Sequence, residues 1–166
     1  MKKIIYIITI FSFLVSCHVK YSFSGADIDP NIKTVSVNYF KNNSGNGPAN
    51  MSDLFTNALK EKILRETNLN LVNENADIEF NGYINSYYYT VQAPTGTETS
   101  DLRRITMKVK VDFVNNIDEK ENWEKDFQNH ADHSVDIDLN SVEEESLEEI
   151  NELIVEEIFN KAFVKW

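Results

Sequence analysis

Two histidines and two aspartates stand close together in the C-terminal half of the chain, at His130, Asp132, His133 and Asp136. Imidazole and carboxylate groups are common ligands of catalytic metal ions, so these residues support the hypothesis of a metal-dependent hydrolase. On an extended strand, however, His130 and Asp132 share one face while His133 points to the other. No cysteine or third histidine accompanies them to complete a ligand set. We therefore favour the interpretation that they are polar residues at the end of a strand, and we predict no metal site.

Other catalytic signatures are absent from the sequence. The chain contains no H-E-x-x-H motif, no G-x-S-x-G motif and no glycine-rich phosphate loop. Carboxylates are abundant in one C-terminal segment, which holds Glu143, Glu144, Glu145, Glu148, Glu149, Glu152, Glu156 and Glu157. Such a row is usually the solvated face of a helix, whereas a carboxyl group suited to acid catalysis needs burial to raise its pKa. The sequence thus predicts neither an enzyme nor a bound cofactor.

Cys17 is the only cysteine, and it directly follows a segment with the pattern of a secretion signal. Two lysines, an uncharged stretch over residues 4–15 and a small serine precede it. This order is typical of a signal peptide, and the uncharged stretch is shorter than the roughly 20 residues that cross a bilayer. We therefore predict a signal peptide over residues 1–16.

The last residues of that segment, Leu-Val-Ser-Cys at 14–17, resemble the lipobox of bacterial lipoproteins. The resemblance implies cleavage before Cys17, a diacylglyceryl group on its sulfur and an acyl chain such as palmitate on its new amine. Several acyl chains together give durable membrane anchoring, which a single chain does not. We expect residues 17–31 to form the lipidated tether and residues 32–166 to form one domain.

The chain is strongly acidic, with 16 basic and 27 acidic residues and a formal charge of −11. Removal of Lys2 and Lys3 with the signal peptide leaves 14 basic residues and a charge of −13. A field of this sign repels nucleic acid, which we therefore exclude as a partner.

Two groups of side chains are candidates for binding a partner or an anion. Aromatic residues gather on one expected strand between Tyr83 and Tyr89, where exposed members such as Tyr87 or Tyr89 would indicate an interface and buried ones only packing. The mature chain has one basic concentration, which comprises Arg103, Arg104, Lys108 and Lys110. Two interpretations of this basic group are open. It contacts an anion such as a lipid phosphate, or it pairs across the sheet with aspartates and glutamates.

Hydrophobic periodicity predicts the elements that carry these residues. Alternation indicates strands over residues 34–40, 77–91, 104–113 and 122–131, and the first of these would bury Val35, Val37 and Tyr39. Helical spacing indicates helices over 51–67 and 140–163, the second with Ser141 and Glu144 as a capping box and with Leu147, Ile150, Leu153, Ile154, Ile158 and Ala162 as its apolar stripe. A short apolar run lies at 69–72, and loops are expected over 41–50 and 92–100.

The order of these elements is strand, helix, about three strands, helix. Each amphipathic helix needs an apolar surface to cover, and a sheet with one apolar face provides it. We predict an α+β two-layer sandwich in which a mostly antiparallel or mixed sheet of about four strands carries both helices on one face.

Several segments of the mature chain resemble the LptE-like lipopolysaccharide-assembly lipoproteins. Beside the lipobox cysteine, these are residues 21–25, 33–40, 54–62, 67–72, 104–107, 123–127 and 156–162. The resemblance implies a sheet with two helices on it and no catalytic residues. It also implies an outer-membrane lipoprotein, on the periplasmic side, that plugs the β-barrel LptD, helps it to assemble and binds the lipid A part of lipopolysaccharide.

The resemblance also suggests where this chain would meet lipopolysaccharide or its barrel. Basic residues around a loop between two central strands would bind the glycolipid, which corresponds here to loop 92–100 and the basic residues from Arg103 to Lys110. No aspartate follows Cys17, so retention in the inner membrane is not indicated. The alternatives are a periplasm-facing lipoprotein that binds another ligand or envelope complex and, less favoured, the metal-dependent hydrolase.

Overall fold

The computed structural model describes residues 27–93 and 101–164. The predicted signal peptide, Cys17, most of the tether and residues 94–100 of the predicted loop lie outside the described residues. The elements in chain order are β1 (Thr34–Val37), β2 (Lys41–Asn42), α2 (Met51–Glu66), β3 (Asn70–Leu71), β4 (Ile78–Gln92), β5 (Leu102–Asn115), the short 3-10 helix η1 (Glu119–Glu121), β6 (Trp123–Ser134) and α3 (Leu139–Phe163).

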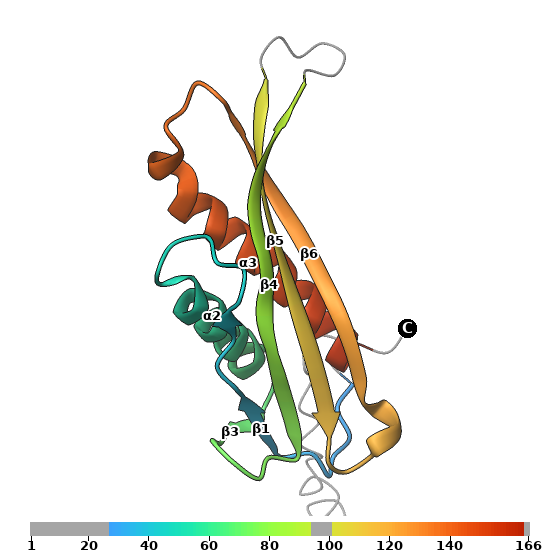
Figure 1. Ribbon diagram of the computed structural model, residues 1–166. Helices are drawn as coiled ribbons and strands as arrows, with labels where there is room; N and C mark the ends of the chain where they lie inside the picture. Colours follow the sequence, from blue (N-terminus) through green and yellow to red (C-terminus); the bar gives the residue numbers. More distant parts are fainter. Residues whose placement is uncertain (1–26, 94–100, 165–166) are drawn as a thin grey trace, which may run out of the picture.

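The strands form one mixed sheet of six strands in the order β3-β1-β4-β5-β6, with β2 also paired to β4. The long strands β4, β5 and β6 are antiparallel neighbours, whereas β1, β2 and β3 pair in parallel. Both helices cover the same face of this sheet (Figure 1). The predicted α+β sandwich is confirmed, but with six strands instead of about four, because β2 and β3 have two residues each and show no hydrophobic period.

The core lies between the sheet and the helices, and β5 is its centre. Ile105, Met107, Val109 and Val111 alternate toward the helices and have no exposed surface. On α3, the predicted stripe is buried at Leu147, Ile150, Ile154 and Ile158. The prediction that Leu153 belongs to this stripe is wrong, since its side chain is 40% exposed.

The buried face of α3 includes the flank that packs against α2, and Leu153 lies on the opposite, solvent-facing flank. Asn151 and Val155 are buried on the flank toward α2, and Lys62 of α2 forms an ion pair with Glu156 beside them. A helix that packs on both a sheet and a second helix buries a wider arc than a simple stripe. Packing between α2 and α3 therefore determines which residues of α3 are buried.

The first predicted strand ends earlier than its alternation indicates. β1 stops at Val37, and the chain then crosses to β2 through Asn38, whose N–H donates to the carbonyl of Phe80 at 2.9 Å. The crossing reverses the alternation, so that Tyr39 is exposed and Phe40 is fully buried against Phe55. The predicted burial of Tyr39 is wrong for this reason.

The N-terminus of α3 is capped by a residue before the predicted capping box. The Asp138 side chain accepts a hydrogen bond from the N–H of Asn140 at 2.8 Å, and Ser141 Oγ donates to the Asp138 carbonyl at 2.6 Å. The predicted capping box of Ser141 and Glu144 is therefore wrong. An aspartate three residues before Ser141 offers the same acceptor chemistry to the free N–H groups and also suits the positive end of the helix dipole.

Asp77 joins the start of β1 to the start of β4. Its carboxylate accepts hydrogen bonds from the N–H groups of Lys33 and Thr34 at 2.7 and 2.8 Å, and Thr34 Oγ1 accepts from the Asp77 N–H at 2.9 Å. The two backbone donors lower the pKa of Asp77 below its ordinary value of 3.8.

Replacement of Asp77 by Asn removes the charge from this joint. We expect Asp77→Asn to lower the free energy of unfolding at neutral pH by about 1–3 kcal/mol, because two charge-assisted hydrogen bonds weaken. Since the pKa is depressed in the folded protein, this stabilisation is present above pH 3.8 and is lost as the pH falls below it. Chemical denaturation between about pH 2.5 and 7 tests both statements, and an equal loss at every pH would contradict the second.

Gly82 lies where β4 passes beneath the Phe40 ring. A Cβ atom at this position would lie 2.1 Å from the carbonyl oxygen of Lys110 and 2.6 Å from Phe40 Cε1. We expect Gly82→Ala to lower the free energy of unfolding by about 2–4 kcal/mol, because the β4–β5 ladder must open to admit the methyl group. Gly45→Ala is the control, since a Cβ atom there would have nothing within 4 Å and only the positive φ of 75° opposes the change. Equal losses in urea denaturation would contradict the steric argument.

Candidate functional site

The predicted tyrosine and lysine contact residues lie on opposite faces of the sheet. Tyr87 and Tyr89 on β4 point toward α3, where both phenols donate to Glu143. Lys108 and Lys110 on β5 form ion pairs with acidic residues of β6 on the other face. The sheet therefore separates the candidate residues into a tyrosine cluster (Tyr87, Tyr89 and Glu143) and a charged outer face.

The tyrosine cluster is held together by one carboxylate. Glu143 Oε1 accepts from Tyr89 Oη at 2.6 Å and from Tyr87 Oη at 3.3 Å, and the two rings meet edge to face with centroids 5.6 Å apart. Tyr87 is only 1% exposed, whereas Tyr89 remains in contact with solvent. Tyr87 thus packs in the core, and Tyr89 joins the core to the surface.

Burial is the main cause of the raised pKa values in this cluster. It raises the pKa of Tyr87 far above 10, and the neighbouring Tyr89 and Glu143 raise it further. Burial together with the hydrogen bond to Glu143 raises the pKa of Tyr89 to about 12. Both phenols are therefore neutral donors at physiological pH, and they hold the first turns of α3 to β4.

The charged outer face is a ladder of cross-strand ion pairs. Arg104 Nε and Nη2 donate to the two carboxylate oxygens of Asp132 at 2.8 and 2.6 Å. Lys108 Nζ lies 3.0 Å from a carboxylate oxygen of Asp126, and Lys110 Nζ lies 2.6 Å from one of Glu124. The Arg104 hydrogen bonds lower the pKa of Asp132, and Glu124 raises the pKa of Lys110.

Arg103 has a different role from its neighbours. Its Nη1 and Nη2 donate to the carbonyls of Ile137 and Val135 at 3.0 and 3.4 Å, which ties β5 to the loop before α3. Each of the four predicted basic residues thus has a partner within the protein. An anion at this face would have to displace a carboxylate or a carbonyl.

The His/Asp group of the hydrolase hypothesis is divided between the two faces. His133 Nε2 lies 2.5 Å from Ser146 Oγ of α3, whereas His130 and Asp132 alternate onto the outer face. Asp132 is bound to Arg104, and Asp136 lies in the following loop beside Ser134. Within residues 27–93 and 101–164, no three His, Cys, Asp or Glu side chains converge as metal ligands.

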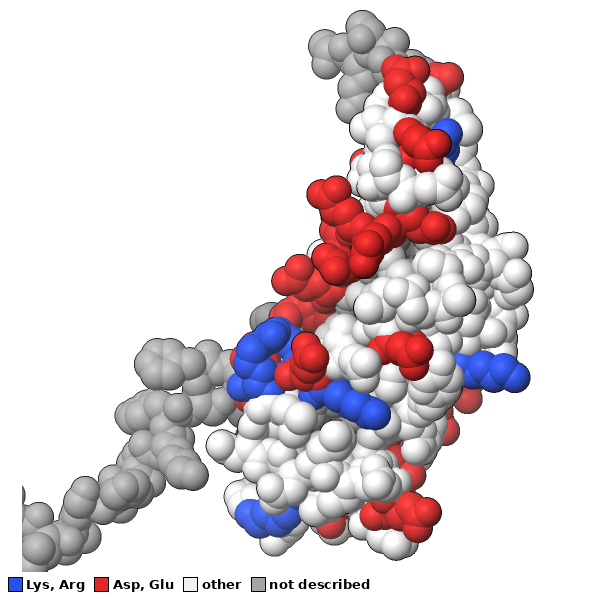
Figure 2. Space-filling model, turned by 90° about the vertical axis from the view of Figure 1, so that its left-hand side faces the viewer, with Lys and Arg blue, Asp and Glu red and all other residues white. Residues whose placement is uncertain are grey.

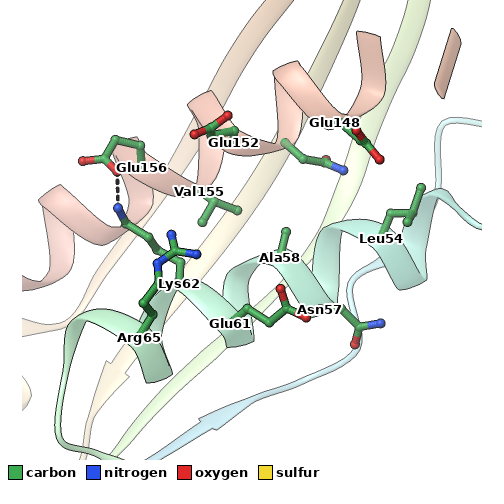
Figure 3. A pocket seen from close by; sticks show the side chains of 11 residues that line it. Leu54, Asn57, Ala58, Glu61, Lys62, Arg65, Glu148, Glu152, Val155 and Glu156 are labelled. Atoms are coloured by element: carbon green, nitrogen blue, oxygen red, sulfur yellow. Dashed lines mark hydrogen bonds and ion pairs between the residues drawn. The ribbon is translucent and has the colours of Figure 1, made fainter. Parts of the chain in front are cut away.

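A groove of about 460 Å³ runs between α2 and α3 (Figure 3). Its lining residues are Leu54, Asn57, Ala58, Glu61, Lys62, Arg65, Glu148, Asn151, Glu152, Val155 and Glu156. Lys62 crosses it to pair with Glu156, and its Nζ also lies 5.2 Å from the centroid of the Phe159 ring on α3. The groove is mostly a solvated ion-pair network that joins the two helices.

Sequence reasoning missed Glu143 and Lys62 as structural links. It treats both only as charges on helix faces, because a 3.6-residue period gives the face of a helix but not what the neighbouring element places opposite it. A weak signal was present for Glu143, which lies near the start of its helix, where a carboxylate is favoured. None of the described helices is long and apolar enough to cross a membrane.

Comparison with known proteins relates the chain to one family. The family described as LptE, lipopolysaccharide-assembly, matches residues 32–162. No curated protein gives a significant match.

Solved structures of similar fold are distant in sequence. A minor lipoprotein from Acinetobacter baumannii is 16% identical with a TM-score of 0.44, over 82% of this chain and 99% of that one. A hypothetical protein from Chlamydia trachomatis is 11% identical with a TM-score of 0.48, over 79% and 93%. An uncharacterized lipoprotein from Nitrosomonas europaea is 12% identical with a TM-score of 0.48, over 77% and 80%. We draw no functional conclusion from likenesses at this level.

The tyrosine cluster makes a spectroscopic prediction. In Glu143→Gln, we expect the pKa of Tyr89 to fall below about 12 but to stay above its ordinary value of 10, because burial, the larger cause, remains while the carboxylate that disfavours the phenolate is removed. Glu144→Gln, one residue away and exposed, is the matched control. A ¹³C NMR titration of the tyrosine ring carbons, assigned with Tyr89→Phe, measures the change. An unchanged pKa in Glu143→Gln would show that Glu143 has no part in it.

The same raised pKa predicts how stability depends on alkaline pH. The pKa of Tyr89 is higher in the folded chain than its ordinary value of 10, so its contribution to stability is complete below pH 10 and is lost as the pH rises toward 12. Urea denaturation across this alkaline range measures the loss. Tyr89→Phe should show a shallower decline than the wild type, and an identical decline would contradict the assignment to Tyr89.

Proposed function

Since the chain belongs to the LptE lipopolysaccharide-assembly family, we propose that it plugs an LptD-type β-barrel and assists lipopolysaccharide transport to the outer leaflet. The family is one of non-enzymatic lipoproteins, and the chain is not an enzyme. In this proposal the protein is anchored in the outer membrane through Cys17, lies on the periplasmic side and helps the barrel to assemble. The family match over residues 32–162, nearly the whole described domain, is the observation that carries the proposal.

The shape of the domain suits a plug. Strands β4, β5 and β6 have 15, 14 and 12 residues, which makes them about 40–50 Å long, and they extend past the N-terminal end of α3 (Figure 1). The lumen of a large outer-membrane barrel is polar. The basic residues of the charged outer face already have carboxylate partners, so entry into such a lumen would bury no unpaired cation there.

Contact with the lipid A part of lipopolysaccharide is a narrower part of the proposal. The candidate residues are Arg103, Arg104, Lys108, Lys110 and Tyr89. The predicted contact residue Tyr87 is left out, because it is only 1% exposed. Because Arg104 is bound to Asp132 by two hydrogen bonds, a lipid phosphate would replace one charge-assisted pair by another. The charge of −13 on the mature chain opposes the approach of an anion, so a plug role depends less on this contact than on shape.

The position of the first described residues agrees with an anchor at one end of the molecule. The Asp27 N–H donates to the carbonyl of Phe163 at 2.8 Å, at the C-terminal end of α3. Gln92 and Leu102, which flank the loop between β4 and β5, lie at the opposite end of the long strands (Figure 1). In the proposal, the anchor end faces the inner leaflet and the hairpin end points into the barrel.

Affinity isolation of the full chain from detergent-solubilised envelope tests the proposal. We expect a large outer-membrane barrel protein to be recovered in about equal amount with the wild-type chain. Lys108→Glu with Lys110→Glu should lower that recovery about tenfold or more, because like charges then face Asp126 and Glu124 and the ladder opens.

The matched control reverses two lysines away from this face, Lys120→Glu with Lys161→Glu, both of which are exposed. Its recovery of the barrel should equal that of the wild type. Circular dichroism establishes that both double variants are folded. A wild-type eluate without a barrel protein, in detergent that preserves other barrel complexes, would refute the plug function.

A further inference from the structure

The edge of β4 that faces away from β5 is paired along only part of its length. β1 pairs with it at residues 78–80, and β2 pairs at Tyr83 and Ile84. Asn46 Nδ2 then donates to the Tyr87 carbonyl at 3.4 Å. Beyond this point, no backbone hydrogen bond from the described residues meets residues 88–92 at this edge.

The backbone groups that remain at this edge can be identified from the register. The Phe80 and Ile84 carbonyls face it, since they accept from the N–H groups of Asn38 and Asn43. A bulge between Ile84 and Ser86 shifts the alternation by one residue, so that the Tyr87 carbonyl faces the same edge.

Alternation then places the N–H and C=O groups of Tyr89 and Val91 there as well. Residues 88–92 of this edge, with those four groups, are named the open edge.

The open edge lacks the features that usually protect an edge strand. Edge strands avoid pairing with other chains through lysines, prolines or bulges within the exposed stretch. Residues 88–92 contain no charged residue and no proline. Three of their side chains are instead large, mainly apolar and accessible, with Tyr88 41%, Tyr89 39% and Val91 65% exposed. Such a strand is suited to accept a further strand from another polypeptide.

The charge beside the open edge indicates what kind of strand fits. Tyr89 contacts Glu143, and Glu144 and Glu148 lie four residues apart on the flank of α3 that turns toward α2. Glu144 and Glu148 are exposed and form no ion pair among the described residues. Figure 2 shows acidic side chains gathered over the upper half of this side of the molecule, with most of the basic ones lower.

We propose that the open edge binds an extended, basic segment of a partner polypeptide as an added β-strand. The backbone of the segment pairs with Tyr89 and Val91, its apolar side chains cover the exposed tyrosine and valine, and its lysines or arginines meet Glu144 and Glu148. A second copy of this chain is disfavoured as the occupant, because two processed chains would each bring a charge of −13. The inference goes beyond the proposed function, because the open edge would bind such a segment whether or not the segment belongs to a β-barrel protein.

Hydrogen exchange with defined peptides tests the inference on the full processed chain in detergent micelles. The probe is a peptide of about nine alternating lysine and valine residues, and the control peptide has glutamate in place of lysine. We expect the lysine peptide at saturation to slow exchange of the Tyr89 and Val91 amides about tenfold or more, and the glutamate peptide to have no effect.

Val91→Pro and Val91→Thr are the matched variants. Proline removes the outward N–H without breaking the ladder to β5, so the affinity for the lysine peptide should fall about tenfold, whereas threonine keeps the N–H and should keep the affinity.

Three results would overturn the inference. The first is no slowing of Tyr89 exchange with millimolar lysine peptide, and the second is equal slowing by both peptides. The third is protection without any peptide that rises with protein concentration together with a doubled mass, which would assign the open edge to a second copy. None of these results depends on whether a barrel is recovered from the envelope, so the two proposals fail separately.

Discussion

The alternation of β5 is the constraint on which the rest of the structure depends. β5 is hydrogen-bonded to β4 on one side and to β6 on the other over nearly its whole length. Its apolar residues from Ile105 to Val111 all face the helices, and its basic residues Arg104, Lys108 and Lys110 all face away. A slip of one residue would exchange the two sets and place charges in the core, so a single register is strongly specified.

The partners of β5 convert this alternation into two surfaces with different chemistry. β6 supplies Glu124, Asp126 and Asp132, which neutralise the basic row and leave a face of formed ion pairs. Toward the helices, β4 supplies Tyr87 and Tyr89, which hold Glu143 and thereby fix the start of α3. A chain with a large negative charge therefore carries a locally balanced face on one side of its sheet and a strongly acidic helix on the other.

The two surfaces of the sheet differ in how they can contact other proteins. The charged outer face is suited to a polar enclosure such as a barrel lumen, because its basic residues Arg104, Lys108 and Lys110 already have carboxylate partners. The open edge of β4 is the opposite case, since its backbone groups have no backbone partner among the described residues and its side chains are accessible. Shape and hydrogen bonding thus carry the assembly functions proposed here, and charge selects the partner.

The α+β class, the two helices, the long strands and the buried side of β5 follow from the amino-acid sequence without further information, because each depends on a local period of two or 3.6 residues. The short parallel strands, the outward turn of Tyr39, the exposure of Leu153 and the partner of each charge emerge only when the chain is folded. At Tyr39 the chain crossing reverses the alternation of the segment, whereas Leu153 keeps the helical period but faces solvent because α3 packs against a second helix on its other flank. Periodicity fixes the direction in which a side chain points along its own element, whereas burial and pairing depend on residues that are distant in sequence and adjacent only after folding.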